Sequence, residues 1–347
     1  MGEYVYETFL ITSIILNFIL TSLYPIFYLK EEKCYMLKVT LVEHTPNPEK
    51  LIATAAKLCY SASNVDDLQK GLTDDKIHSF LEMLMDLGHE SPMEHVTFTF
   101  VIEGISRSCG NQLVRHRIAS YSQQSQRYVN MNQFEYVIPP SIEYASDPAL
   151  KERYCGIMSS LQKDYELLVN ALTVLTYENI RKEKGFVDGN EPSMEIQKKI
   201  LDQAKKQANE DARFILPNAC ETRIMVTMNI RSLYNFFKHR MCTRAQWEIR
   251  ALAWEMWRQC MNVSPLLFKH AGPSCVYGKC PEGKMSCGNS AKVKVLHHKY
   301  VKWCQIDKKP MTPIVNNQSS YTHNSNVPTL DDISRELFKE EGNGGNE

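Results

Sequence analysis

The sequence lacks the short motifs by which many nucleotide and metal sites are recognised. It contains no G-x-G-x-x-G and no G-x-x-x-x-G-K-S/T string, which excludes a dinucleotide site of the Rossmann type and a P-loop. No H-E-x-x-H motif and no paired C-x2-C are present, which argues against a zincin site and a zinc ribbon. No internal repeat is visible either. Any cofactor site must therefore be built in another way.

Neither sign of charge is in excess, because 40 Lys and Arg residues balance 40 Asp and Glu residues. A protein that wraps nucleic acid usually carries a global basic surplus, so that class is disfavoured. Basic clusters should then be local anion sites. The 347 residues, 43% of them hydrophobic, can form one large or two modest domains with a sizeable core.

Eleven scattered cysteines predict reduced thiols in a cytoplasmic protein, because their number is odd and many lie in apolar surroundings. One local group stands apart, in which His270 precedes Cys275, Cys280 and Cys287 in a C-x4-C-x6-C pattern. This spacing differs from that of a zinc ribbon, so we predict a loop of reduced thiols without a metal. A structural metal is the alternative.

One long apolar run occupies residues 8–29, and its length suits a membrane-spanning helix or a signal anchor. Glutamates precede it where a secretory peptide would have basic residues. Met36 and the strand-like residues after it have the character of a true start. Residues 1–35 are then an N-terminal extension, either a membrane segment or translated upstream sequence.

Periodicity predicts an α+β fold with helices around a mixed or antiparallel sheet. Alternating apolar and polar residues indicate strands at 38–43, 96–102, 134–138 and 222–230. Helical spacing and end signals indicate helices at 48–61, 74–87, 193–215 and 245–260, with one long helix or two between 147 and 184.

The most unusual stretch is Arg115-His116-Arg117, followed by a Ser/Gln-rich segment that ends at Arg127. Two guanidiniums beside an imidazole are costly to crowd unless an anion neutralises them, and the planar Arg fork suits phosphate or carboxylate. If 106–114 is helical, Gln112, Arg115 and His116 share one face. Residues 120–126 are poor in helix formers and predict a loop that faces something polar. A solvated basic helix end is the alternative.

Polar residues at other places are further ligand candidates. Arg213 lies in an apolar helix end, where it needs a carboxylate or a bound anion. Asn229, Arg231 and Asn235 lie where a strand turns into a helix, which suits either a ligand or helix capping. Segment 88–95 is rich in His and Glu, but Pro92 interrupts any metal-binding helix, so we predict no metal there.

Together these residues resemble the signature of the flavin-dependent thymidylate synthases. The shared pattern is Arg-His-Arg at 115–117, then Ser120, Ser125 and Arg127. The string Ala-Gln-Trp-Glu-Ile at 245–249 is also typical of that family. The likeness runs from Met36 to about Asn289. It implies a catalytic domain at 36–289. Residues 290–347 are then a C-terminal extension, and the Asn-, Ser-, Thr-, Pro- and Gly-rich composition of residues 307–347 predicts that this extension is largely disordered.

The resemblance implies an enzyme that methylates dUMP to dTMP, with 5,10-methylenetetrahydrofolate as carbon donor, FAD as hydride carrier and NADPH as reductant. It also implies the thymidylate synthase-complementing protein fold and a homotetramer whose active sites are shared between subunits. The positions that match dUMP ligands are Gln112, Leu113, Val114, Arg115, Gln123, Gln124, Ser125, Gln126, Arg127, Arg213 and Arg240. The positions that match FAD ligands are His89, Ser91, Arg115, His116, Arg117, Gln123, Asn229, Ile230, Arg231 and Asn235.

The implied chemistry uses arginine instead of a cysteine nucleophile. Folate-only thymidylate synthases carry a nucleophile in a Pro-Cys-His string, which is absent from this sequence. The other solution polarises the uracil with fixed Arg donors and delivers hydride from a flavin. By its position in the family pattern, Arg240 is the catalytic residue, favouring ionisation of the uracil N3. Many members have Asn-Glu where this chain has Ser122-Gln123, so we give Gln123 no acid–base role.

Two other interpretations stay open. A nucleotide- or RNA-binding module could use the Arg-His-Arg loop on phosphates without catalysis, although only Tyr121 and Tyr128 are aromatic near it. A membrane-tethered enzyme would follow if residues 8–29 are an anchor. We expect a cytoplasmic enzyme with no nucleic-acid partner.

Overall fold

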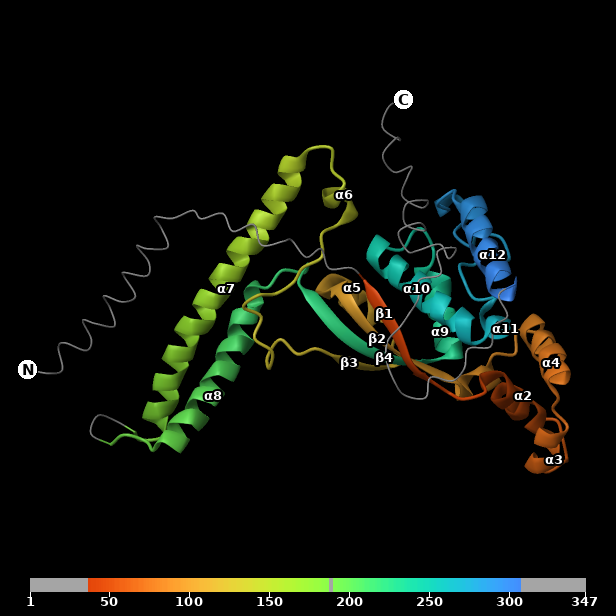
Figure 1. Cartoon of the computed structure of the whole chain (residues 1–347), viewed down its shortest axis with the longest axis horizontal. Helices are drawn as coiled ribbons and strands as arrows, with labels where there is room; N and C mark the ends of the chain where they lie inside the picture. Colours follow the sequence, from red (N-terminus) through yellow and green to blue (C-terminus); the bar gives the residue numbers. More distant parts are fainter. Residues whose placement is uncertain (1–36, 187–189, 307–347) are drawn as a thin grey trace, which may run out of the picture. The chain divides into compact units, whose positions relative to one another are not determined.

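A four-stranded antiparallel sheet carries the fold, in the order β1-β2-β4-β3 (Figure 1). The computed structural model describes residues 37–186 and 190–306. The strands are β1 (Lys38–His44), β2 (Thr97–Ser106), β3 (Ser120–Gln123) and β4 (Glu221–Asn229). Phe98, Phe100 and Ile102 of β2 lie opposite Met228, Val226 and Ile224 of β4, and all six are buried. One face of the sheet is therefore an apolar layer, as the alternation predicts.

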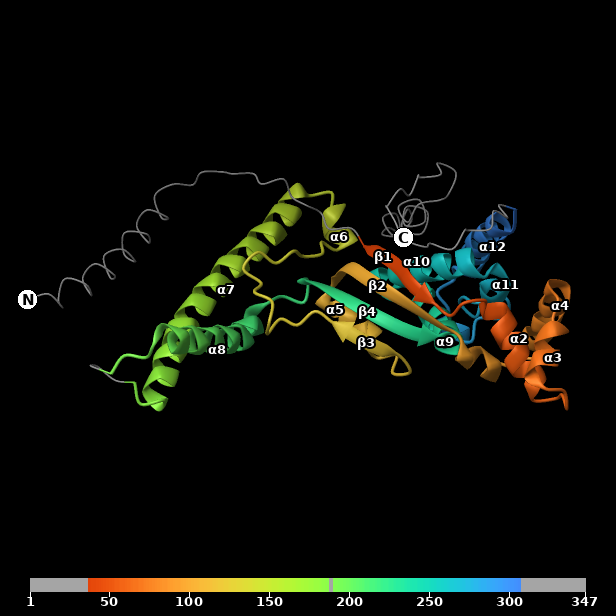
Figure 2. The same cartoon turned by 60° about the horizontal axis from the view of Figure 1, so that its bottom comes forward.

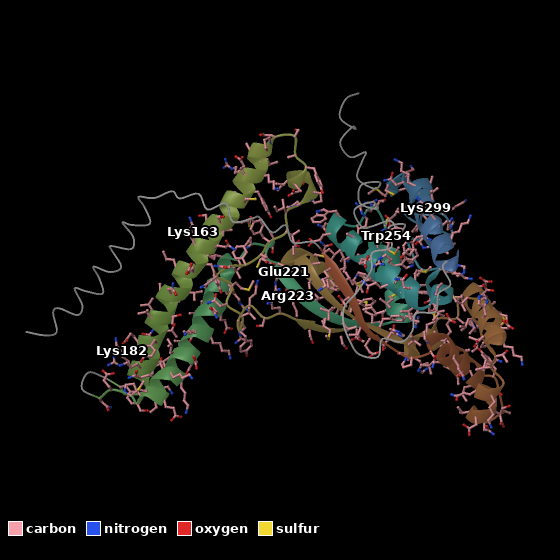
Figure 3. All side chains as sticks on the ribbon, viewed as in Figure 1. Lys163, Lys182, Glu221, Arg223, Trp254 and Lys299 are labelled. Carbon is pink, nitrogen blue, oxygen red and sulfur yellow. The ribbon has the colours of Figure 1, made fainter. Side chains whose placement is uncertain are left out.

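Helices from both ends of the described chain cover this apolar layer and form the main core with it. They are α2 (Pro48–Leu58), α4 (Asp74–Asp86), α9 (Ile230–Arg240), α10 (Trp247–Val263), α11 (Pro265–Phe268) and α12 (Ser290–Ile306), with the 3-10 turn η1 (Ser91–His95). Gln259 of α10 ties this layer to edge strand β1, because its side chain bonds both Leu41 N and Val39 O at 2.6 Å. Trp254 lies on the buried side of α10, facing α12 (Figure 3).

A long helical hairpin forms a second core. Helices α7 (Pro148–Glu183) and α8 (Met194–Ala212) lie side by side (Figure 2). Tyr165 and Val169 of α7 pack with Phe134 and Cys220, the latter just before β4. Lys163 and Lys182 are on the exposed side of α7 (Figure 3). The segment predicted as one long helix or two is thus the single helix α7, and the hairpin joins the sheet where β4 starts.

Short helices complete the described chain. They are α3 (Val65–Lys70), α5 (Arg107–Leu113), α6 (Pro140–Glu143), η2 (Arg213–Ile215) and η3 (Gly283–Met285).

Three local predictions are wrong. Residues 120–126 are not all loop, because Ser120–Gln123 pair with β4 as strand β3. Residues 134–138 are not a strand but hold a single bridge, between Tyr136 and Cys220. Helix α5 ends at Leu113, so Arg115 and His116 lie beyond it and do not share a helical face with Gln112. For Ser120–Gln123, pairing with β4 overrides the local preference.

The packed part of the chain extends past the predicted boundary at residue 289. Helix α12 places Val293, Leu296 and Tyr300 in the main core, because these residues recur at helical spacing on one face. The apolar run at 8–29 lies outside the described residues. Among helices of the described ranges, none has the length and hydropathy needed to cross a membrane.

One buried histidine in this core, His297, is expected to make the stability of the fold depend on pH. His297 of α12 is fully buried, its Nε2 donates to Ala271 O at 2.7 Å, and its ring stacks on Trp257 with centroids 4.5 Å apart. Burial, with a smaller effect of His298 and His270, lowers the pKa of His297 from 6.5 to about 4, although its bond to Ala271 opposes the shift. The native state therefore resists protonation of this ring.

Acidification is expected to destabilise the protein through His297. The unfolded chain binds more protons between about pH 6.5 and pH 4, so this stability is present above that window and lost as the pH falls through it. Between about pH 7.5 and about pH 5, the wild type should lose about 2 kcal/mol more unfolding free energy than His297→Gln. Urea unfolding at both pH values measures the difference. An equal pH dependence of the two proteins would contradict the assignment.

Candidate active site

The start of β4 gathers several residues predicted to bind dUMP. Gln123, at the end of β3, donates from Nε2 to the Thr222 hydroxyl at 3.2 Å, across a sequence separation of 99 residues. Gln126 Nε2 lies 3.8 Å from the Cys220 sulfur. Gly110 of α5 approaches so closely that a Cβ there would lie 3.2 Å from the Gln123 amide nitrogen. The Ser/Gln segment is thus held against β4 by its side chains.

A cleft of about 450 Å³ is lined by two further predicted dUMP residues, Arg127 and Arg213, together with Lys206, Glu210 and Phe214. Arg127 pairs with Glu210 at 2.9 Å. Arg213, in η2 just after α8, has no hydrogen-bonding or ion-pair partner for its side chain among the described residues. The sequence predicted that Arg213 would need either a carboxylate or a bound anion. No described carboxylate forms an ion pair with it, so a bound anion stays a prediction.

A second group lies at the end of α9. Arg240 Nε donates to His116 Nε2 at 3.0 Å, and the His116 ring packs edge-on against Phe236 with centroids 4.9 Å apart. Burial, with the nearby charges of Arg240 and His239, lowers the pKa of His116 to about 4. His116 is therefore neutral at pH 7 and can accept from the permanently charged Arg240. The contact fixes the guanidinium through Nε, and no bond to a described residue engages its two terminal nitrogens.

A buried thiol lies near this arginine. Cys109 of α5 is fully buried, and burial and the charge of Glu248 raise the pKa of its thiol well above the usual range, although Arg240 lowers it. A thiol is a weak nucleophile until it ionises. Cys109 therefore packs as a small apolar residue, not as a reactive group.

Several of the residues predicted to bind the flavin gather where β4 ends and α9 begins. Arg231 pairs with Glu94 and with Glu90, the latter at 3.4 Å. Asn229 Oδ1 accepts from Ser232 N at 2.8 Å, which confirms the capping role that the sequence offered as an alternative. His89, Ser91, Arg231 and Asn235 are exposed around this junction.

Comparison with known proteins matches residues 40–266 to the family described as thymidylate synthase complementing protein. A flavin-dependent thymidylate synthase from Clostridium tetani is 52% identical over 261 residues, which are 75% of this chain and 97% of that protein. One from Geobacter sulfurreducens is 44% identical over 262 residues, 75% of this chain and 97% of the relative. One from Pyrococcus furiosus is 38% identical over 256 residues, 71% and 90% respectively.

The chain belongs to the flavin-dependent thymidylate synthase family. This confirms the resemblance and makes the protein an enzyme of the methyltransferase class. The matched residues include every position predicted to bind dUMP or FAD. The roles of the individual residues stay predictions.

In this member of the flavin-dependent thymidylate synthase family, the predicted ligand residues form separate groups, at the two ends of β4 and at the end of α9. A side-chain hydrogen bond, that between His116 and Arg240, joins a residue predicted for FAD to one predicted for dUMP. Arg115 and Arg117 are exposed on the segment after α5. Leu113 and Ile230 have fully buried side chains, so those side chains pack in the core and do not face a ligand.

Sequence reasoning missed several residues around the site. Thr222 holds Gln123, and Glu248 of α10 accepts from both Ser106 N at 2.5 Å and Ser106 Oγ at 2.6 Å. Arg107, the first residue of α5, donates to the Thr222 hydroxyl at 3.4 Å. Only the pairing of β3 with β4 and the packing of α10 on α5 bring these residues together. The one available signal was a carboxylate, Glu248, between the apolar Trp247 and Ile249 at a helix start.

In the structure a fourth cysteine, Cys242, lies near the predicted group of Cys275, Cys280 and Cys287. Burial raises the pKa of the Cys275 thiol, and nearby Cys242, Cys280 and Cys287 raise it further, although a bond from Ser290 opposes this. Cys242 comes from the turn after α9, whose Thr243 hydroxyl lies 2.8 Å from the Cys287 sulfur. Within residues 37–186 and 190–306, no group of three or more His, Cys, Asp or Glu side chains is arranged to hold a metal ion.

Proposed function

We propose that this enzyme converts dUMP to dTMP, with 5,10-methylenetetrahydrofolate as carbon donor and NADPH as reductant, and that it holds FAD. The observation that carries the proposal is the family match over residues 40–266, which spans all the assigned ligand positions. The curated relatives are named as synthases, so the alternative of a binding module without catalysis is not favoured.

In this proposal Arg240 contacts the uracil and stabilises negative charge that develops on its ring. A guanidinium already held by His116 needs no reorganisation during the reaction, which is the main advantage of a preorganised donor. Gln112, Gln123 and the segment from Gln124 to Arg127 hold the rest of the nucleotide, together with Arg115 and Arg213. FAD, when bound, supplies the hydride.

The groups proposed for FAD suit an anionic dinucleotide. Arg115 and Arg117 provide charge for a diphosphate, whereas the charge of Arg231 is already shared with Glu90 and Glu94. His89, Ser91, Asn229 and Asn235 provide hydrogen bonds from η1 and α9. Such a site depends on side chains from several elements, in keeping with the absence of a glycine-rich loop.

A cysteine nucleophile has no place in this mechanism. Pro-Cys-His is absent from the sequence, and burial keeps the Cys109 thiol protonated. The charge on the uracil must then be stabilised by arginine.

We propose further that the enzyme is a homotetramer whose active sites combine residues of several subunits. Ile118 and Phe214, which flank the candidate site, are 77% and 83% exposed, and Met225 on the less covered sheet face is 44% exposed. Apolar side chains so exposed beside a site are typical of surfaces that a partner covers. The catalytic domain of the proposal begins at residue 36, and residues 1–35 lie outside it.

The purified full chain tests the proposal. We expect visible flavin absorbance, a tetramer in light scattering, and dTMP formed only when dUMP, methylenetetrahydrofolate and NADPH are all supplied. A protein that cannot be loaded with FAD would contradict it, as would NADPH oxidation that yields no dTMP.

A further inference from the structure

Four cysteines gather beside the turn that follows α9, and the proposed function uses none of them. Cys242 lies in this turn, and Cys275, Cys280 and Cys287 lie in the loop between α11 and α12. All four are free thiols. Burial raises the pKa of the Cys275 thiol most, and the other three sulfurs are near enough to raise it further. The loop lies beyond residues 40–266, so the family match does not account for this cysteine quartet.

Direct contacts hold the turn after α9 against the loop. Thr243 donates from its hydroxyl to the Cys287 sulfur at 2.8 Å. Arg244 donates to Met285 O and lies 3.7 Å from Glu282. The two segments therefore meet, although 44 residues separate Thr243 from Cys287 along the chain.

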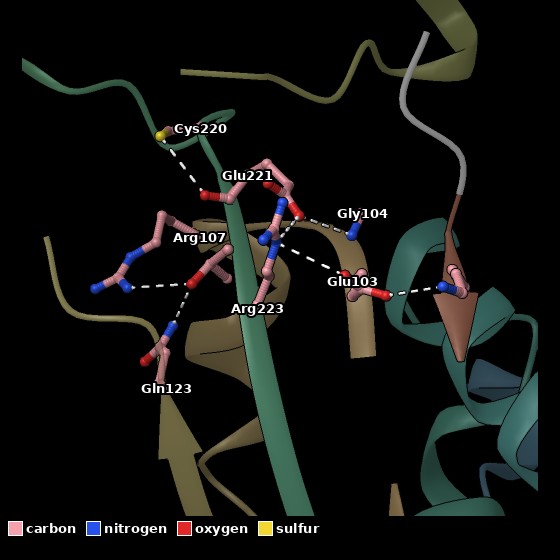
Figure 4. Close-up of polar contacts among 9 residues, drawn as sticks. Glu103, Gly104, Arg107, Gln123, Cys220, Glu221 and Arg223 are labelled. Carbon is pink, nitrogen blue, oxygen red and sulfur yellow. Dashed lines mark hydrogen bonds and ion pairs between the residues drawn. The ribbon is translucent and has the colours of Figure 1, made fainter. Parts of the chain in front are cut away.

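Solvent reaches part of the quartet. Cys242, Cys280 and Cys287 are half-buried, whereas Cys275 is buried. Cys220 provides a contrast, because burial raises the pKa of its thiol to about 12 and the thiol donates to the backbone O of the next residue at 3.7 Å (Figure 4). The quartet differs from such a packed thiol in joining several sulfurs at a place that a small solute can reach.

Neighbouring thiols of this kind can be oxidised reversibly to a disulfide. A peroxide oxidises the first thiol to a sulfenic acid, and one water is released. The second thiol then attacks the sulfenic sulfur, so that an S–S bond forms and a second water leaves. One peroxide thereby accepts the two electrons. In proteins with reduced thiols, disulfides of this type are usually transient and redox-sensing.

We propose that Cys287 and Cys242 form a reversible disulfide when the enzyme meets a peroxide, with Cys287 oxidised first. Thr243 holds the Cys287 sulfur against the turn that contains Cys242. Closing the bond requires the Thr243 hydroxyl to release this sulfur, which displaces the turn two residues after Arg240.

The displacement gives the disulfide a consequence for catalysis. Arg240 is the last residue of α9, and a misplacement of about 1 Å at a group that acts on substrate can cost up to about a hundredfold in rate. Oxidation should therefore slow dTMP formation. This consequence rests on the proposed function of Arg240, whereas the disulfide itself rests on the contacts between turn and loop.

The test treats the full-length FAD-loaded enzyme with hydrogen peroxide and maps disulfides by mass spectrometry without reduction. We expect a peptide that links Cys242 to Cys287, a loss of about 10-fold in dTMP formation with FAD retained, and recovery with dithiothreitol. Cys242→Ser and Cys287→Ser should form no such link and should keep most of their activity. Cys59→Ser is the matched control, because Cys59 is an exposed cysteine at the end of α2, and it should respond like the wild type.

Other outcomes separate the disulfide from its consequence and from the proposed function. A link that leaves Cys242 free would overturn the proposal, as would zinc bound by the reduced wild type and lost in Cys287→Ser, which would make the quartet a metal site. Equal loss of activity in Cys242→Ser and the wild type would show that peroxide acts elsewhere and would overturn the effect on catalysis. Reduced wild type that forms no dTMP would instead contradict the proposed function, and the mapped link would still decide the disulfide. Should Cys287→Ser fail to fold, Cys242→Ser decides alone.

Discussion

Arg240→Ala is expected to lose roughly a hundredfold in dTMP formation at saturating dUMP while it retains FAD. Removing one donor that stabilises charge in a water-poor site costs about 3 kcal/mol of transition-state stabilisation, which corresponds to about that factor in rate. The structure supports the choice of residue, because His116 Nε2 accepts from Arg240 Nε at 3.0 Å and so fixes the guanidinium. Single-turnover measurement of dTMP isolates the chemical step from product release.

Three further variants test whether the loss in Arg240→Ala is specific to this guanidinium. Arg240→Lys should recover little, because an ammonium cannot donate to His116 and to the uracil with the geometry of a planar fork. Arg213→Ala should mainly weaken dUMP binding. Arg244→Ala is the control, since Arg244 is an exposed arginine four positions along that contacts Met285 O and Glu282. If Arg240→Ala made dTMP at nearly the wild-type rate, the proposed uracil activation would be wrong even though the family assignment stood.

Glu248→Ala is expected to cost about 3 kcal/mol of unfolding free energy, because it removes two short hydrogen bonds from a buried place. Glu248 accepts from the backbone N and the hydroxyl of Ser106, and that hydroxyl in turn accepts from Cys109 N at 3.0 Å to cap α5. Burial raises the pKa of the Glu248 carboxyl, whereas its bonds from Ser106 oppose the rise. The alanine variant would leave buried donors without an acceptor.

The measurement is urea unfolding at neutral pH, with dUMP affinity as a second readout. Helix α5 carries Gln112, a residue predicted to bind dUMP, so its loosening should also weaken dUMP binding. Glu248→Gln keeps the shape and one acceptor and should lose less than the alanine variant. Glu195→Ala is the control, because Glu195 is an exposed α8 residue paired with Lys199 and should cost within about 0.5 kcal/mol. A loss as small as the control's would show that Ser106 finds other partners.

Elements with strong periodicity were predictable because one face of each is buried. Strands β1, β2 and β4 alternate, and helices α4 and α10 repeat apolar residues at helical spacing, so burial and local pattern agree. Strand β3 was missed because Ser120–Gln123 has no apolar alternation, and its strand conformation comes from pairing with β4. The apolar residues at 134–138 indicated a strand, but Phe134 packs with the α7 core and only Tyr136 forms a bridge.

The sequence by itself determined the family and the kinds of side chain at the site, because the Arg-His-Arg and Ser/Gln motif is local and its order along the chain is its signature. It also determined that neither a glycine-rich loop nor a Pro-Cys-His nucleophile is present. Only the tertiary structure decided which of those charges are already neutralised. Arg127 and Arg213 are equivalent as sequence candidates, yet Glu210 pairs with the first alone. Arg107 is positioned by Thr222, which lies 115 residues away along the chain. His116 is positioned by Arg240, which lies 124 residues away. Electrostatic neutralisation depends on distances of a few ångströms between distant segments, and periodicity along a chain does not encode such distances.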